Sequence, residues 1–154
     1  MNNIIISNEV RSHIALHFKQ NLPGSKFFVD SPEALLNLAQ QLFPKTFSTA
    51  KPDDDGRIRI SLIFPQNIGV SNVVSIEALS DEEKRRIEIV DRNGKMARCV
   101  KTDRAIPTNE CQIILSTDWN LITMFPGEMA PPLPASPNIS DEFWDRHVFI
   151  EPFR

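Results

Sequence analysis

Glycine, cysteine and long apolar runs are all scarce in this 154-residue sequence. Its five glycines argue against a glycine-rich nucleotide cradle, and it has no phosphate-binding loop, no GxSxG elbow and no paired Asp/Glu arrangement typical of metal-dependent nucleases. Cys99 and Cys111 lack metal-like spacing, so we predict buried free thiols and a fold without disulfides. The opening segment has three consecutive isoleucines and no basic region, which is too short for a signal peptide or a membrane span.

The bulk composition is that of an ordinary globular protein. With 41% hydrophobic and 24% charged residues, the chain is long enough to form one domain with a substantial core. The net charge of −3 argues against nucleic-acid binding through the overall field of the protein, but it leaves room for a local basic patch.

Two helices are predicted in the N-terminal part, over 7–43. The first covers 8–20, with Ser7 as its N-cap and apolar residues spaced along one stripe. The second begins at Ser31, where a serine cap precedes Pro32 at the first helical position, and it ends before Pro44.

Strands are predicted over 57–126, and a proline-rich tail over 127–154. Segment 57–64 alternates apolar and polar residues, as a half-buried strand does. Asn93-Gly94 is the strongest short-range hairpin signal, between strands at 86–91 and 95–100. The predicted fold class is α+β: two N-terminal helices packed on a mostly antiparallel β-sheet, followed by the proline-rich tail.

A second hairpin, within Cys111–Pro134, is almost wholly apolar. Its polar turn is followed by a return strand from Leu121 to Phe125, and both strands resemble those covered on both faces. Thr123 is the one polar side chain in the middle of the return strand. Its hydroxyl is either tolerated in an ordinary β-forming residue or held on a rigid platform for chemistry.

His13 and His17 are four residues apart, so a helix projects them from one face. Such a pair can chelate a metal, but chelation needs further ligands, and no HExxH motif is present. The pair is otherwise a structural feature, partly buried or exposed, or an acid–base catalyst, because imidazole titrates near neutral pH.

Segment 84–104 is strongly basic in a chain of net negative charge. It has a net charge of +5, because it holds three acidic residues and eight basic ones: Lys84, Arg85, Arg86, Arg92, Lys95, Arg98, Lys101 and Arg104. These side chains either bind phosphate or protect the edge of a strand.

Three short motifs occur in a suggestive order: Ser12-His13-Ile14 with His17, then Ser25-Lys26-Phe27, and finally Thr123-Met124-Phe125-Pro126. Together with the order of helices and strands, they resemble the bacterial polymorphic-toxin ribonucleases of the barnase/EndoU/colicin/RelE-like group. The resemblance extends over about residues 13 to 126.

That resemblance implies RNA cleavage by attack of the 2′-hydroxyl, without metal or other cofactor. It implies His13 and His17 as acid and base, Thr123 as a hydrogen-bond donor, and Lys26 with Arg92 or Arg98 as phosphate clamps. The implied partners are RNA, with tRNA as one candidate, and a cognate immunity protein. The implied site of action is the cytoplasm, reached through a secretion system without a cleaved signal or a membrane anchor.

Two other hypotheses remain open. The chain is alternatively a non-catalytic binding or inhibitor module that docks a partner through the apolar hairpin and Pro131-Pro132-Leu133-Pro134. That proline segment is either an extended polyproline ligand or a tail packed along the sheet. A zinc hydrolase is the third hypothesis.

Overall fold

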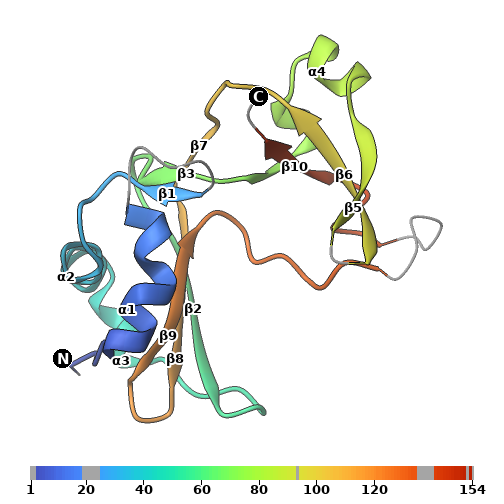
Figure 1. The fold of residues 1–154 in the computed structure, drawn as a ribbon. Helices are drawn as coiled ribbons and strands as arrows, with labels where there is room; N and C mark the ends of the chain where they lie inside the picture. Colours follow the sequence, from blue (N-terminus) through green and yellow to red (C-terminus); the bar gives the residue numbers. More distant parts are fainter. Residues whose placement is uncertain (1–2, 19–24, 93, 135–140, 152, 154) are drawn as a thin grey trace. The chain divides into compact units, whose positions relative to one another are not determined.

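The computed structural model describes residues 3–18, 25–92, 94–134, 141–151 and 153. The chain forms two compact units, each built from two segments. Unit 1 comprises 1–70 and 107–127, and unit 2 comprises 71–106 and 128–154. Both units contain helices and strands (Figure 1), so the predicted α+β class is confirmed. That the two units fold as a single domain stays a prediction.

The two predicted helices of unit 1 begin where the sequence predicts, and a third, shorter helix was not predicted. α1 (Asn8–Ile14) starts after Ser7, whose side chain accepts a hydrogen bond from the Val10 amide, and it continues as the 3₁₀ helix η1 (Ala15–Phe18). α2 (Pro32–Leu42) is capped in the same way by Ser31. The short α3 (Pro44–Ser48) follows directly. The predicted end of the first helix, at residues 19–24, lies outside the described residues.

Unit 1 contains two small sheets. In the first, β2 (Arg57–Ile63) pairs antiparallel with β8 (Glu110–Ser116), which pairs antiparallel with β9 (Leu121–Pro126). The second joins β1 (Lys26–Phe27), β3 (Gly69–Val70) and β7 (Pro107–Thr108). The alternation predicted for 57–64 is confirmed, because every second side chain of β2 is buried.

The core of unit 1 lies on one face of the β2–β8–β9 sheet. Three cross-strand rows of buried side chains form this core face: Ile58, Leu115 and Leu121; Ile60, Ile113 and Met124; and Leu62, Cys111 and Pro126. Ile14 of α1 and Leu35 of α2 belong to the same buried cluster, and Figure 1 shows α1 alongside β9. Burial of these apolar side chains is the main source of stability in unit 1.

Unit 2 is built on a four-stranded sheet with the order β4–β10–β6–β5. β5 (Glu88–Arg92) and β6 (Lys95–Lys101) form the predicted hairpin. β10 (His147–Glu151) lies between β6, to which it is parallel, and β4 (Val73–Ser75), to which it is antiparallel.

The strands are therefore arranged differently from the predicted single sheet with a tail. The strands of the described residues belong to three sheets, and the region predicted as a tail supplies an inner strand. The strands that pair with β10 lie far from it in the sequence. Local sequence patterns do not reveal such pairing, so β10 was not predicted as an inner strand.

A second core lies under the unit 2 sheet. Val74, Val100 and Val148 come from three neighbouring strands and are at most 6% exposed. Leu79 completes the cluster from the loop between the 3₁₀ helix η2 (Ile76–Ala78) and α4 (Asp81–Arg85). Ser80 starts α4 through a capping box with Glu83, so both side chains satisfy amides at the helix start.

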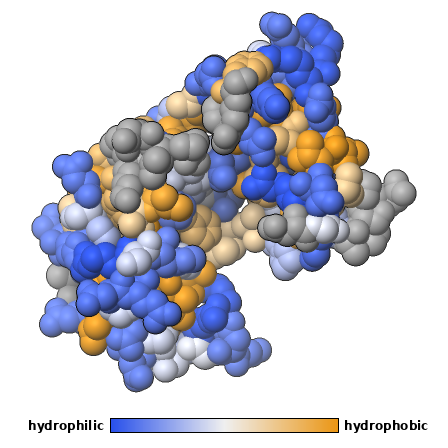
Figure 2. Space-filling view, viewed as in Figure 1, coloured by the Kyte–Doolittle hydropathy of each residue, from blue (hydrophilic) through white to orange (hydrophobic). Residues whose placement is uncertain are grey.

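Most of the large apolar side chains among the described residues are buried inside the two units. Cys99 and Cys111 are both buried free thiols, as predicted. In the view of Figure 2, exposed apolar side chains form separate patches among hydrophilic ones. Among the described residues, no helix is long and apolar enough to cross a membrane.

Gly69 is required where β3 passes close to β1. A Cβ atom at this position would lie 2.2 Å from the carbonyl oxygen of Lys26, which is backbone and cannot move away alone. We expect Gly69→Ala to lower the free energy of unfolding by about 2 kcal/mol or more, as overpacking does. Urea denaturation followed by circular dichroism measures this change.

Gly94→Ala is the matched control. Gly94 has a φ of +83° but open space around its Cα, so alanine there costs only backbone strain of about 1 kcal/mol. An equal or smaller loss for Gly69→Ala would contradict the close approach of β1 and β3.

Candidate functional site

His17 is held in a defined orientation in unit 1. Its Nδ1 atom lies 2.7 Å from the carbonyl oxygen of Ser25, and the side chain is half-buried. A carbonyl oxygen only accepts, so Nδ1 carries the hydrogen of this bond. In the neutral imidazole, the hydrogen is then on Nδ1 and Nε2 is free to accept a proton. This is the tautomer that a general base needs when its Nε2 atom faces the reacting group.

Lys26 follows Ser25 directly and belongs to β1, which packs against η1. The structure therefore brings His17 and Lys26 into one region of unit 1. His13 lies on the preceding turn of α1 and is exposed. These three are the predicted site residues that share a neighbourhood.

Thr123 lies on the opposite face of the sheet from the core. A bulge between Ile114 and Leu115 shifts the register, so Thr123 pairs with Ile114 and Met124 takes the core position opposite Ile113. A one-residue shift moves a strand side chain to the other face. Because α1 packs on the core face, the structure does not bring Thr123 together with the histidines.

Arg92 is engaged inside unit 2. Its guanidinium donates to Glu151 at 2.9 Å and lies 3.9 Å from the ring centroid of Phe149. These contacts connect β5 to β10 across the intervening strand β6, so the predicted phosphate clamp already has structural partners.

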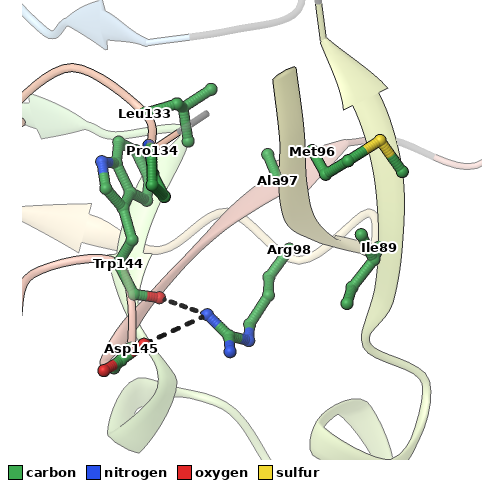
Figure 3. Close-up of a pocket in the computed structure, with 8 residues that line it drawn as sticks. All are labelled: Ile89, Met96, Ala97, Arg98, Leu133, Pro134, Trp144 and Asp145. Atoms are coloured by element: carbon green, nitrogen blue, oxygen red, sulfur yellow. Dashed lines mark hydrogen bonds and ion pairs between the residues drawn. The ribbon is translucent and has the colours of Figure 1, made fainter. Parts of the chain in front are cut away.

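Arg98 is also engaged. Its guanidinium donates to the carbonyl oxygen of Trp144 at 2.8 Å and lies 3.8 Å from the carboxylate of Asp145, as Figure 3 shows. The cavity beside it measures about 20 Å³, which leaves room for little more than one water molecule. Arg98 therefore ties β6 to the turn before β10.

The proline segment packs within unit 2. The indole Nε1 of Trp144 donates to the carbonyl oxygen of Pro131, and Lys95 donates to that of Leu133, each at 3.1 Å. In Figure 3, Leu133 and Pro134 lie beside the Trp144 ring. Of the two alternatives for this segment, these contacts favour the packed tail.

The third histidine, His147, joins two parts of the same tail. Its Nδ1 lies 2.8 Å from the carbonyl oxygen of Phe143, and its Nε2 lies 2.5 Å from a carboxylate oxygen of Glu128. The ring stacks on Phe143 at 3.8 Å and is 8% exposed. The two ring nitrogens therefore each lie against an oxygen atom, a backbone carbonyl at Nδ1 and a carboxylate at Nε2, and the ring connects Glu128 to the turn at Phe143.

The basic segment contributes one group of cations that the sequence reasoning did not select. Arg85, Arg86 and Lys101 line a pocket of about 400 Å³ in unit 2. The signal was present in the net charge of the segment. Only the tertiary structure distinguishes the basic residues that line a pocket from those that form ion pairs inside the unit.

Neither cysteine provides a reactive thiol at neutral pH. Burial raises the pKa of Cys111 to about 12, and burial together with the nearby Glu151 raises that of Cys99 to about 11. Both groups are therefore protonated near pH 7, and the thiolate is the nucleophilic form. Among the residues that the structure describes, no three His, Cys, Asp or Glu side chains are grouped to hold a metal ion.

Comparison of the chain with protein-family models, with curated proteins and with solved structures found no match. The geometry of the side chains and the short sequence motifs are therefore the basis for a functional proposal.

Glu83 is the most buried carboxylate among the ion pairs of the described residues. Its side chain is 6% exposed and accepts hydrogen bonds from Arg104 at 2.6 and 3.3 Å. The Arg104 guanidinium, and then the Ser80 amide, lower the pKa of Glu83 to about 2. A carboxyl whose pKa falls on folding stabilises the folded state above its ordinary pKa near 4.5, and this contribution is lost as the pH falls toward 2.

We expect Arg104→Ala to lower the free energy of unfolding by about 1.5 kcal/mol near neutral pH, because it leaves a buried carboxylate without its charged donor. The difference from wild type shrinks as the pH is lowered from about 5 to about 2. Urea denaturation at a series of pH values measures it.

Arg146→Ala is the control for this test. Arg146 lies 4.0 Å from Glu142, both side chains are largely exposed, and its loss costs at most about 0.5 kcal/mol. If Arg104→Ala had an equally small effect, or a difference independent of pH, the assigned role of Glu83 would be wrong.

Proposed function

We propose that this chain is a metal-independent endoribonuclease in which His17 is the general base and Lys26 binds the scissile phosphate. The observation that carries the proposal is the 2.7 Å contact between the Nδ1 of His17 and the carbonyl oxygen of Ser25. It orients the ring and leaves Nε2 as the proton acceptor, at a point in the chain next to a lysine.

In the proposed reaction, His17 Nε2 takes the proton of a ribose 2′-hydroxyl. The oxygen attacks the adjacent phosphorus, the bond to the 5′-oxygen breaks, and a 2′,3′-cyclic phosphate forms. The ammonium of Lys26 stabilises the charge that builds on the phosphoryl oxygens. His13, the second imidazole on the same helical segment, supplies the proton that the leaving 5′-oxygen takes up.

Arg92, Arg98 and Thr123 have no part in this proposed site. The two arginines are engaged with Glu151 and with the turn at Trp144, and Thr123 lies across the sheet from the core face. The order of the short motifs around His17 and Lys26 supports RNA as the substrate, with tRNA as a candidate met in the cytoplasm. A cognate immunity protein that covers these cationic groups would be acidic there.

Docking of a protein through the apolar hairpin has less support. Residues 111–115 of β8, as well as Leu121 and Met124 of β9, are buried in unit 1. The proline segment is likewise engaged with Trp144 and Lys95. The surfaces on which that hypothesis depends are therefore occupied by the protein itself.

The test incubates the purified chain with tRNA and with rRNA in the presence of EDTA. We expect fragments that end in 2′,3′-cyclic phosphate. His17→Ala lowers the cleavage rate by about 100-fold or more, as loss of a general base does. Lys26→Gln lowers it by about tenfold or more, because the charge on the phosphate loses its partner.

Lys45→Gln is the matched control for Lys26→Gln, since Lys45 is an exposed lysine of α3 in the same unit. Circular dichroism shows whether each variant is folded. Absence of cleavage by the wild type, or equal cleavage by wild type and a folded His17→Ala, would refute the proposal.

A further inference from the structure

The pocket of about 400 Å³ in unit 2 is a candidate site for a small ligand. Its floor is the face of the sheet opposite the apolar core. On β6, Cys99 and Lys101 flank the core residue Val100, so their side chains lie on the other face, where Cys99 pairs with Glu88 and Lys101 pairs with Glu151. Its volume lies in the range of small-molecule binding sites. It uses neither His17 nor Lys26, so its occupant is a question separate from the proposed cleavage.

The charge around this pocket favours an anion. Arg85, Arg86 and Lys101 line it, together with the carboxylates of Glu88 and Glu151. Glu151 is neutralised by Arg92 at 2.9 Å. Arg85 and Lys101 are exposed, and no ion pair with another described residue engages either of them. Two cations therefore face the solvent at the edge of the pocket.

An aromatic ring and an apolar floor accompany these cations. Phe153 is 51% exposed, and the guanidinium carbon of Arg86 lies 5.5 Å from its ring centroid. The Phe153 amide donates to Asp103 at 2.9 Å, which fixes the backbone that carries the ring. Val90 and Cys99 lie beneath as half-buried and buried apolar groups. An exposed ring of this kind is suited to stack on a planar heterocycle.

We propose that this pocket binds a nucleoside monophosphate. Arg85 and Lys101 hold the phosphate, as charged donors do, and the base stacks on Phe153 above the apolar floor. The same chemistry is offered by a free mononucleotide and by the terminal nucleotide of a single-stranded nucleic acid. Phosphate alone, or a base alone, uses only half of the pocket.

Isothermal titration calorimetry on the full chain tests the proposal. The ligands are AMP, adenosine and ribose 5-phosphate, together with a 5′-phosphorylated 2′-O-methyl tetranucleotide that cannot undergo 2′-hydroxyl attack. We expect saturable binding of AMP, with adenosine and ribose 5-phosphate each weaker by about tenfold or more. Tighter binding of the tetranucleotide than of AMP identifies a strand end as the source, and equal binding identifies the free nucleotide.

Variants separate the two halves of the pocket. Lys101→Gln and Arg85→Gln weaken AMP binding by about tenfold, and Phe153→Ala does so by a similar factor through loss of stacking. Arg57→Gln, which replaces an exposed arginine of unit 1, leaves it unchanged. Because all four positions are exposed, these variants retain the fold, as circular dichroism verifies.

Two results would overturn the proposal. One is the absence of saturable AMP binding, or equal AMP binding by the wild type and the three pocket variants. The other is equal binding of AMP and ribose 5-phosphate, because the pocket would then recognise an anion and not a nucleotide. Since the tetranucleotide cannot be cleaved and AMP contains no internucleotide bond, both results are independent of the activity proposed for His17.

Discussion

Backbone pairing between segments far apart in the sequence is the constraint on which both units depend. In unit 1, β2 (57–63) pairs with β8 (110–116), and most of the chain between them belongs to unit 2. In unit 2, β10 (147–151) lies between β4 and β6. Neither core can form from local structure alone, because its buried side chains share one face only after these strands pair. The helices then cover a surface that the sheets have created.

Internal pairing of charge decides which cations remain for a ligand. Three arginines each meet a carboxylate or a carbonyl inside unit 2: Arg92 bonds Glu151 of β10, Arg98 bonds Trp144 in the turn before β10, and Arg104 bonds Glu83 of α4. Withdrawing a charged group from such partners costs free energy, so the role of these three side chains is structural. Arg85 and Lys101, by contrast, are exposed and make no ion pair with another described residue.

Local signals in the sequence predicted local structure well. The serine caps at Ser7 and Ser31, the alternation of β2 and the Asn93-Gly94 hairpin signal all act within a few residues, and the helices and strands that they indicate are present. The inner strand β10 was missed because its partners lie many residues away. The face of Thr123 depends on a single bulge, which hydrophobic pattern does not reveal. The partners of Arg98 come from the turn at Trp144 and are equally distant in the sequence.

The position of β10 in the sheet also sets an order of events during synthesis. Every other described strand leaves the ribosome before β10, so β6 is complete while its inner neighbour is still unmade. At ordinary elongation rates this interval lasts on the order of seconds, which is long compared with hairpin formation. Until it ends, the backbone amides and carbonyls on one side of β6 are open to any other strand. A nascent chain of this protein therefore has a defined period in which a chaperone is of most use to it.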